Sequence, residues 1–250
     1  MKFYNAVVFD LDSTLVKIEG LDWLANRLGK LDALSKLTKQ SMDGKISFQE
    51  AMKIKMATIA PSFKDLLDLG NAYSESLVED AKEVIRAIQS LDKDVWILTG
   101  NFQPAVGKAA FALGIPKEKI ICNEIYFDEE GKYKGFNIGH PLAANGGKAV
   151  MLNKYLNKQK TVFVGDGYTD LEAQKEVTLF IGYGGVVKRE NIRKASNIYL
   201  LCESLSPLLK IILSNAERNT LKNNGYKKLL TKASGLATSS AIIRRPASRI

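Results

Sequence analysis

The sequence predicts an α/β fold, a doubly wound parallel sheet with a helical cap inserted after its first strand. Short apolar runs that end at polar residues alternate with stretches of helical periodicity, as in a parallel sheet covered on both faces. After the first such run, residues 21–69 keep a helical period, and this block is the expected cap. The 250 residues, 46% hydrophobic and 25% charged, suit one α/β domain with a smaller accessory unit.

The first strand is expected at residues 6–9, a short apolar run, and the helical block after it is interrupted at Gly44 and Pro61. Strands and helices then alternate along the chain. Helices are predicted at 78–91, 104–113, 147–156, 171–175 and 189–195, strands at 95–98, 161–164 and 179–181, and a hairpin at 125–136. Beyond about residue 214 no regular period persists.

Three units are predicted, with a catalytic core at 1–14 and 72–213, a helical cap at 15–71, and a basic tail at 214–250. The tail holds eight basic residues and one acid, so it carries most of the formal net charge of +9. Such a tail could contact nucleic acid or an anionic lipid surface, but tails of this kind are more often simply solvated. Only Tyr226 supplies an aromatic ring among its basic residues, which weakens the nucleic-acid interpretation.

Several classes of protein are disfavoured by what the chain lacks. No apolar run approaches the roughly 20 residues that span a bilayer, and the start has no secretory pattern, so a cytoplasmic protein is expected. Cys122 and Cys202 show no metal-ligand or redox spacing, which favours reduced structural thiols. His140 is the only histidine and precedes Pro141 in a loop-like stretch, so a histidine-dependent nucleophile is not favoured.

Four polar clusters are expected at the carboxyl ends of strands, where open α/β sheets bind their ligands. They lie at residues 10–14, 99–101, 145–148 and 165–170. A single Asp-x-Asp pair could merely cap a loop in solvent. Four clusters on one edge of a sheet indicate a shared site instead.

The acidic clusters predict a magnesium site. Asp10 and Asp12 are two residues apart and project to one side, where their repulsion must be relieved by a cation or a proton. Asp166 and Asp170 add negative charge at the end of another strand. Such an all-oxygen set suits Mg²⁺. The predicted magnesium ligands are therefore Asp10, Asp12, Asp166 and Asp170.

The other clusters predict phosphate binding. Lys148 falls in the first turn of its helix, where a cation is unfavourable unless an anion lies between it and the helix terminus. Thr99 offers a hydroxyl and Gly100 lets the backbone approach a ligand closely, although an ordinary turn with Asn101 as a helix N-cap is the alternative. Thr169 and Glu172 also form a possible capping box.

Together these groups predict phosphoryl transfer to an aspartate. Asp10 attacks phosphorus while Lys148, Thr99 and the metal hold the charged oxygens. Asp12 protonates the departing alkoxide and then takes a proton from the water that hydrolyses the aspartyl-phosphate.

The run at 10–14, with Thr99, Lys148 and the run at 165–170, resembles the four ordered motifs of the haloacid dehalogenase-like superfamily. The resemblance implies that Asp10 is the nucleophile and Asp12 the acid/base. It also implies that Mg²⁺ is held by Asp10, by the backbone carbonyl of Asp12 and by Asp166, with Asp170 as a supporting acid.

A closer resemblance, over roughly residues 3–213, is to phosphoserine phosphatases. The positions that carry it are residues 19–22, Met42 and Gly44, Phe48 and Ala51, and residues 180–185. It implies that Glu19 binds the substrate ammonium, that Met42 lines the closed pocket, and that Lys148 and Thr169 contact the phosphate. Without the resemblance, Glu19 and Lys55 would be interpreted as surface charges on helical segments.

Three positions depart from the family pattern. Lys55 stands where an arginine usually grips the serine carboxylate, and a lysine offers only a compact point charge. Asn101 ends a Thr-Gly-Asn run where Ser-Gly-Gly is usual, and Asp43 replaces a glycine of the cap. The residues expected to bind substrate are Glu19, Met42, Lys55, Thr99, Gly100, Asn101, Lys148 and Thr169.

The leading hypothesis is a magnesium-dependent phosphatase that converts O-phosphoserine to serine and phosphate in serine biosynthesis. Alternatives with the same fold are a phosphatase for another small phosphorylated metabolite and a phosphotransferase that uses an alcohol acceptor. An interaction protein that engages nucleic acid or membrane through its basic tail is a further alternative. Clustered carboxylates argue against it, since a pure binding module does not need them.

Overall fold

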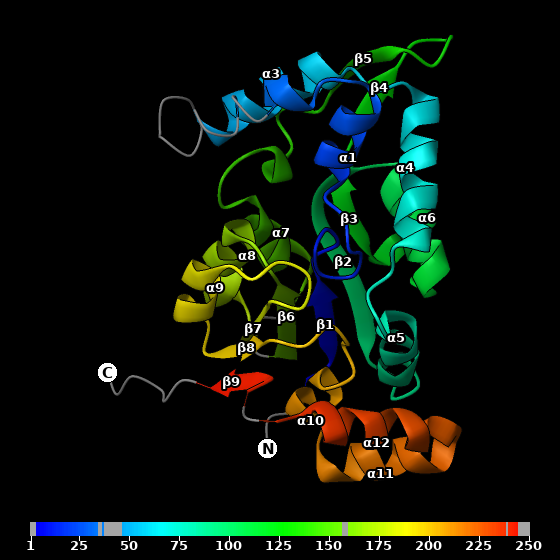
Figure 1. Cartoon of the computed structure of the whole chain (residues 1–250), viewed down its shortest axis with the longest axis vertical. Helices are drawn as coiled ribbons and strands as arrows, with labels where there is room; N and C mark the ends of the chain where they lie inside the picture. Colours follow the sequence, from blue (N-terminus) through cyan, green and yellow to red (C-terminus); the bar gives the residue numbers. More distant parts are fainter. Residues whose placement is uncertain (1–3, 35–36, 38–46, 157–159, 239, 245–250) are drawn as a thin grey trace.

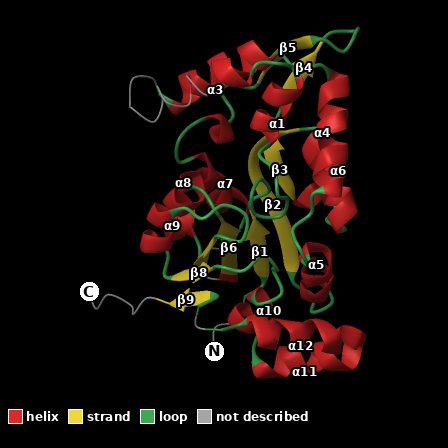
Figure 2. Ribbon diagram, in the orientation of Figure 1, coloured by secondary structure: helices red, strands yellow, loops and turns green. Residues whose placement is uncertain are grey.

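The structure is a computed structural model that describes residues 4–34, 37, 47–156, 160–238 and 240–244. Within these residues a seven-stranded sheet has the order β3-β2-β1-β6-β7-β8-β9 (Figure 1; Figure 2). Its strands are β1 (Ala6–Phe9), β2 (Asp94–Phe102), β3 (Ile120–Asn123), β6 (Thr161–Gly165), β7 (Leu179–Tyr183), β8 (Ile198–Leu200) and β9 (Ile242–Arg244). All neighbouring strands are parallel except β8 and β9. The predicted α/β fold class is confirmed.

The central strand shows why the sheet is covered on both faces. Val7, Val8 and Phe9 of β1 are fully buried, and successive side chains point to opposite faces. Val7 and Phe9 belong to the larger apolar core, with α5 (Ala81–Gln89) and α6 (Ala105–Leu113). Val8 belongs to a second core with residues of α7 (Gly147–Tyr155) and α9 (Glu190–Ala195). Burying each such side chain stabilises the fold by roughly 1.5–3 kcal/mol. Because both faces of β1 are buried, its sequence is a continuous apolar run and does not alternate with polar residues.

The helices of the other face are short and follow the strands in turn. They are α7 (Gly147–Tyr155), α8 (Tyr168–Glu172) and α9 (Glu190–Ala195), with 3₁₀ turns at Pro141–Ala143 and Ala173–Glu176. A further 3₁₀ turn, Lys117–Lys119, precedes β3, and α6 ends at Gly114 in the left-handed region, as its position predicted.

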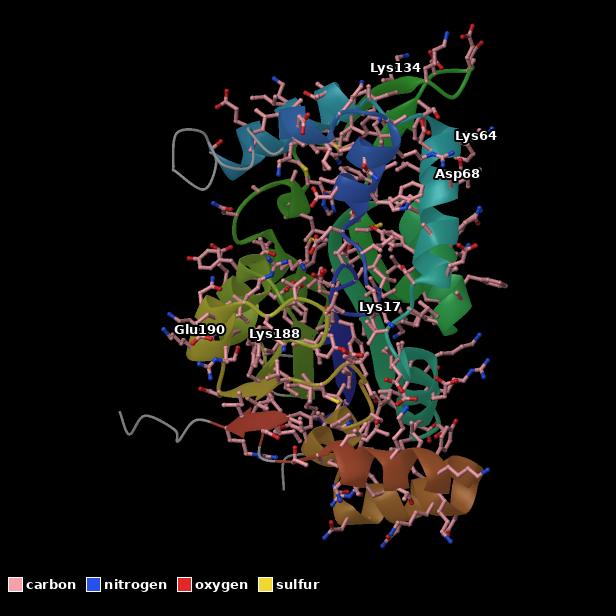
Figure 3. All side chains as sticks on the ribbon, viewed as in Figure 1. Lys17, Lys64, Asp68, Lys134, Lys188 and Glu190 are labelled. Atoms are coloured by element: carbon pink, nitrogen blue, oxygen red, sulfur yellow. The ribbon has the colours of Figure 1, made fainter. Side chains whose placement is uncertain are left out.

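The inserted block after β1 is helical, as predicted, and consists of α1 (Gly20–Arg27), α3 (Phe48–Ile59) and α4 (Phe63–Glu75). A capping box starts α4, since the Ser62 hydroxyl accepts from Asp65 N and the Asp65 carboxylate accepts from Ser62 N. The buried residues of α4 are Leu66, Leu69, Gly70 and Tyr73, one helical stripe, and the labelled Lys64 and Asp68 lie on its other side (Figure 3).

The predicted hairpin is present as β4 (Ile125–Phe127) and β5 (Tyr133–Phe136), a separate antiparallel pair. It packs against the start of α4. Phe63 N donates to Gly131 O, and the rings of Phe63 and Phe127 meet edge to face with centroids 5.5 Å apart. The hairpin therefore lies with α1, α3 and α4 at the end of the molecule beyond the carboxyl ends of β1 and β2 (Figure 1).

The C-terminal segment differs from the expectation that it has no regular structure. After α10 (Leu208–Ile212), it forms α11 (Asn215–Leu221) and α12 (Lys227–Leu236), which are joined through a kink at Gly225, and then β9, which pairs with β8. Leu221, Leu230 and Ala233 are buried there. Short helices with three inward side chains leave too weak a period to detect in the sequence.

Three ion pairs fasten this segment to the core at the end opposite α1 and α3 (Figure 1). Lys93 Nζ lies 2.7 Å from Glu217 Oε1, and Lys232 Nζ lies 2.6 Å from Glu79 and 2.7 Å from Asp80. One of the basic residues predicted for the tail, Lys232, is thus paired with acidic residues of the core. In the part of the chain that the structure describes, no helix combines the length and the apolar character needed to cross a membrane.

Candidate active site

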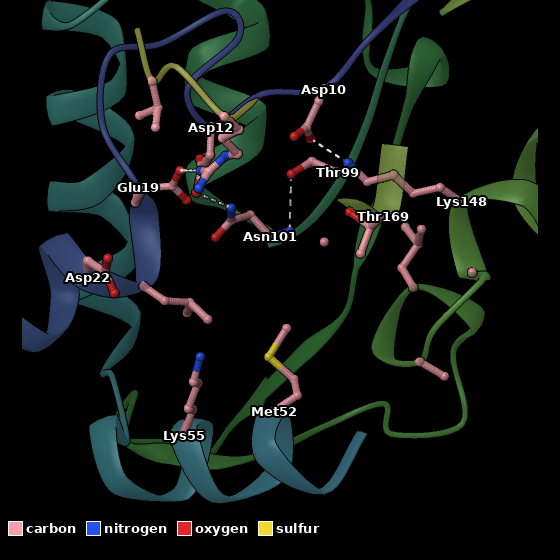
Figure 4. Close-up of a pocket in the computed structure, with 17 residues that line it drawn as sticks. Asp10, Asp12, Glu19, Asp22, Met52, Lys55, Thr99, Asn101, Lys148 and Thr169 are labelled. Atoms are coloured by element: carbon pink, nitrogen blue, oxygen red, sulfur yellow. Dashed lines mark hydrogen bonds and ion pairs between the residues drawn. The ribbon is translucent and has the colours of Figure 1, made fainter. Parts of the chain in front are cut away.

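A cavity of about 490 Å³ lies between the carboxyl ends of the strands and the inserted helices (Figure 4). It is lined on the sheet side by Asp10, Asp12, Thr99, Gly100, Asn101, Lys148 and Thr169, and on the cap side by Glu19, Asp22, Met52 and Lys55. Most residues predicted from the sequence therefore gather around one cavity. Asp166 and Asp170 lie beside Asp10, and Met42 lies outside the described residues.

Three carboxylates converge because their strands are neighbours in the sheet. Phe9 of β1 is in register with Val164 of β6, and Asp10 N donates to Val164 O at 3.0 Å. Oxygen atoms of Asp10, Asp166 and Asp170 lie within 4.8 Å of one another, and all three residues are buried. Residues separated by more than 150 positions thus form one acidic cluster.

A glycine makes room for Asp170. A Cβ atom at Gly165 would lie 2.4 Å from Asp170 Cγ, so a side chain there would expel the carboxylate. Asp170 also caps the start of α8, because its Oδ2 accepts from the backbone N of the N-cap residue Gly167 at 2.9 Å. The predicted capping box of Thr169 and Glu172 is therefore wrong. Thr169 lies inside α8 and lines the cavity, while Glu172 accepts from Gly146 N at the start of α7.

Lys148 lies in the first turn of α7, as predicted, and its ammonium is buried between two acids. Its Nζ is 2.7 Å from Asp10 Oδ1 and 2.5 Å from Asp170 Oδ1. Burial alone would lower the pKa of Lys148, but the two carboxylates outweigh it and raise the pKa. Lys148 is therefore a permanent positive charge directly beside the predicted nucleophile.

Arg189 is a site residue that the sequence prediction missed. It follows β7 and lines the cavity, and its Nε lies 2.9 Å from Asp166 Oδ2. Its Nη2 lies 3.1 Å from Glu19 Oε1, which connects the acidic cluster to the cap side. Arg189 lies six residues after the end of β7 and next to Lys188, so the rule that led to the other clusters, a polar residue directly after a parallel strand, does not single it out.

The cluster fits a divalent cation. Five carboxylates lie in or beside this part of the cavity (Asp10, Asp12, Glu19, Asp166 and Asp170), and among the described residues two cations, Lys148 and Arg189, form ion pairs with them. Burial, followed by the charge of Asp10, raises the pKa of both Asp166 and Asp170. Neighbouring carboxylates repel one another when all are ionised, and a hard divalent cation that binds their oxygen atoms relieves this repulsion.

Asp12 has surroundings different from those of the other acids. Its Oδ2 accepts from Gly20 N and from Asn101 Nδ2, both at 2.7 Å (Figure 4). Burial, and then the negative charge of Glu19, raises its pKa to about 7. A carboxyl group with such a pKa can both give and take a proton near neutral pH.

Asn101 belongs to β2 rather than to a helix cap, because α6 begins later, after Pro104. Its backbone N donates to Thr99 Oγ1 at 3.2 Å, and its side chain reaches Asp12. The alternative interpretation of residues 99–101 as an ordinary N-capping turn is therefore wrong.

The cap side carries charges of both signs. Ser13 adopts a left-handed backbone conformation (φ 52°) and donates its hydroxyl to Glu19 Oε1 at 2.7 Å, which holds Glu19 at the cavity. Lys55 extends from α3 towards the cavity, beside Met52 (Figure 4). Burial lowers the pKa of Lys55, and Asp22 and Glu19 partly oppose that shift. Asp22 and Met52, which also line the cavity, were not predicted as site residues.

Comparison with known proteins agrees with the fold and the site. Residues 4–178 match the family model of haloacid dehalogenase-like hydrolases, and the chain belongs to this superfamily. It is 34% identical over 199 residues to phosphoserine phosphatase of Bos taurus, covering 78% of this chain and 88% of that protein. The human phosphoserine phosphatase is 33% identical over 203 residues, covering 79% of this chain and 90% of that one.

Two solved structures have the same fold. A phosphoserine phosphohydrolase-like protein from Francisella tularensis superposes with a TM-score of 0.72 at 25% identity, over 85% of this chain and all of that one. A substrate-bound phosphoserine phosphatase complex gives a TM-score of 0.71 at 25% identity, with the same coverage. Within its superfamily the chain belongs to the phosphoserine phosphatase family, and it is a phosphatase.

Proposed function

We propose that the protein hydrolyses O-phosphoserine to serine and phosphate, with Mg²⁺ as cofactor and Asp10 as the residue that is phosphorylated. The observation that carries the proposal is the arrangement of the cavity. The acidic cluster and Lys148 form its floor, and carboxylate and ammonium side chains face it from the cap side. A phosphate ester that also bears an ammonium and a carboxylate matches both parts.

In the first step, Asp10 attacks phosphorus and the ester bond to the alkoxide breaks. Lys148 lies 2.7 Å from Asp10 Oδ1 and is positioned to stabilise charge on the phosphoryl oxygens. The residues that would hold Mg²⁺ are Asp10, Asp166 and the backbone carbonyl of Asp12, with Asp170 in support. When bound, the ion supplies the positive charge that lets a carboxylate approach a phosphate dianion.

Asp12 transfers the protons in both steps. In its neutral form it gives a proton to the departing serine oxygen, and the resulting carboxylate accepts a proton from the water that attacks the aspartyl-phosphate. That water breaks the bond between phosphorus and Asp10, so Asp10 returns as a free carboxylate. The raised pKa of Asp12, about 7, supports both roles near neutral pH.

Glu19 and Lys55 are the proposed specificity residues. Glu19, held by Ser13 and Arg189, would pair with the substrate ammonium. Lys55 would pair with its carboxylate, as a point charge rather than a two-pronged contact. Thr99, Gly100, Asn101 and Thr169 line the cavity between these groups and the acidic cluster.

A substrate panel tests the proposal. Phosphate release with Mg²⁺ is measured for phosphoserine, phosphothreonine, a phosphosugar and a nucleotide, and the highest kcat/KM is expected for phosphoserine. Preference for a substrate without both ammonium and carboxylate would exclude the roles of Glu19 and Lys55, and would favour another small phosphorylated metabolite. Repeating the assay with an added alcohol acceptor measures transfer to the alcohol against hydrolysis, and hydrolysis is expected to dominate.

A further inference from the structure

The carboxyl group of Asp12 has one oxygen with two donors and one oxygen with none. Oδ2 accepts from Gly20 N and Asn101 Nδ2, whereas Oδ1 is buried and makes no hydrogen bond within the described residues. The hydroxyl of Tyr73, a fully buried residue of α4, is likewise without a hydrogen bond there. Besides Trp96 Nε1, these are the buried side-chain polar atoms of the described chain in that condition.

The two atoms belong to one neighbourhood. A Cβ atom on Gly20 would lie 2.0 Å from Tyr73 Oη and 2.9 Å from Asn101 Oδ1, while the backbone N of Gly20 is bonded to Asp12. The Tyr73 hydroxyl and the Asp12 carboxyl therefore both adjoin Gly20, although no hydrogen bond joins them. A side chain at position 20 would clash with the Tyr73 hydroxyl, so a glycine is needed there.

Leaving both groups unpaired is costly. A buried polar group without a partner costs about 1–3 kcal/mol, and a buried tyrosine hydroxyl normally has a partner. An O–H donor and a carboxylate oxygen are a complementary pair, so a hydrogen bond between these two groups would satisfy both atoms. The donor on the other oxygen, Asn101, stands where the family pattern has a glycine.

We propose that Tyr73 is a positioning residue whose hydroxyl donates to Asp12 Oδ1 in the substrate-bound protein. Tyr73 on one oxygen, with Gly20 and Asn101 on the other, then fixes the plane of the carboxyl group that exchanges protons with the leaving group and the water. Tyr73 and Gly20 lie on α4 and α1, which belong to the inserted helices, and Asn101 lies on β2. Docking of these helices on the sheet is therefore part of what places the acid.

The inference rests on the proposed function and predicts an effect that depends on the leaving group. An alkoxide such as that of serine needs a well-placed acid to depart, whereas p-nitrophenolate departs with little assistance. A mispositioned Asp12 should therefore slow formation of the phosphoenzyme from phosphoserine more than from p-nitrophenyl phosphate.

The test is single-turnover release of the leaving group, with Mg²⁺, in full-length wild type and Tyr73→Phe. Serine release is expected to slow about tenfold, with p-nitrophenolate release changed by less than about twofold and the substrate concentration dependence unchanged. If Tyr73→Phe slows both esters equally or slows neither, the hydroxyl does not position the acid. Thermal unfolding of each variant confirms that the protein is folded.

Two further variants keep the outcome interpretable. Asn101→Gly removes the donor on the other oxygen and should also slow serine release selectively, which tests the arrangement even if Tyr73→Phe does not fold. Tyr183→Phe is the matched control, because Tyr183 is equally buried but donates its hydroxyl to Glu203 O at 2.9 Å, outside the site. It should leave the ratio of the two rates unchanged. A wild type that hydrolyses neither ester would overturn the proposed function instead.

Discussion

The floor and the cap side of the cavity are built in different ways. On the floor, Asp10, Asp170 and Lys148 are buried and joined by ion pairs of 2.5–2.7 Å. On the cap side, the side chain of Glu19 is 42% exposed, and Lys55 extends from a helix without an ion pair among the residues described. Removing one partner of a buried ion pair strongly destabilises the protein, whereas breaking an exposed ion pair changes the free energy of unfolding little.

This difference separates chemistry from specificity. In the proposed mechanism, the floor performs the phosphoryl transfer that all substrates share, and its side chains constrain one another. The cap side would contact the part of the substrate that varies, and its side chains take no part in the ion pairs that join Lys148 to Asp10 and Asp170. Arg189 is the exception, because it contacts Asp166 on the floor and Glu19 on the cap side.

The largest effect is expected from Asp10→Asn, which removes the nucleophile while keeping the side-chain shape. Steady-state phosphate release should fall by at least about 10³-fold for every substrate, with little change in KM. Asp92→Asn, at an exposed turn, is the control and should retain full activity. Wild-type turnover in Asp10→Asn would mean that the floor is not the reaction centre.

Metal removal should be nearly as damaging, because the excess negative charge of the floor would then repel a phosphate dianion. Treatment with a chelator is expected to abolish activity, and Mg²⁺ to restore it. Mg²⁺ should also stabilise the folded protein, by about 2.7 kcal/mol at a concentration 100 times its Kd. Thermal unfolding measured with and without Mg²⁺ checks this independently of turnover, and the absence of any shift would contradict a metal site at the acidic cluster.

The pH dependence of the free energy of unfolding should also reveal the excess negative charge of the floor. Because Asp166 and Asp170 have pKa values raised above the ordinary 3.8, the native metal-free protein keeps protons that the unfolded chain has released. Their contribution to stability is therefore fully present below pH 3.8 and is lost as the pH rises through the raised values. Urea unfolding between pH 5 and 8.5 should show that the stabilisation by Mg²⁺ grows with pH, whereas a constant gain would contradict it.

A smaller effect is expected on the cap side from Lys55→Arg. If Lys55 binds the substrate carboxylate, a guanidinium group would hold it through two hydrogen bonds and lower the KM for phosphoserine by about 2–10-fold, with kcat nearly unchanged. A phosphate ester without a carboxylate is the control substrate and should show no gain. An equal change in KM for both esters would separate Lys55 from carboxylate recognition.

The smallest kinetic effect is expected from a residue outside both regions. Leu221→Ala in α11 removes a fully buried side chain and should lower the free energy of unfolding by about 2–5 kcal/mol. The kcat and KM of the folded fraction should stay unchanged, because α11 lies at the other end of the core. A changed KM for phosphoserine would show that the C-terminal segment acts on the site.

The accuracy of the sequence predictions varied with the distance over which the determining interactions act. The strands β1, β2, β6 and β7 and the helices around them were predicted because their apolar runs and periods are local, whereas β3, β8 and β9 were missed. The gathering of Asp10, Thr99 and Asp166 was predictable because parallel strands end at one edge of the sheet, whereas Lys148 reaches them from the first turn of α7 rather than from a strand end. The Thr169 capping box failed because the N-cap of α8 is Gly167, two residues earlier than expected, so that Asp170 rather than Glu172 caps the helix. The C-terminal helices were missed because they are short and bury few side chains, so no helical period stands out in the sequence.

By itself, the sequence determined which side chains stand at the ends of the strands, and hence the acidic character of the site and the class of reaction. Only the tertiary structure decided how those groups are paired. Arg189 on Asp166 and Glu19, Lys148 between Asp10 and Asp170, and Asn101 on Asp12 each join residues from separate elements. Such pairing depends on how separate elements pack to within a few ångströms, and no local pattern along the chain encodes that packing.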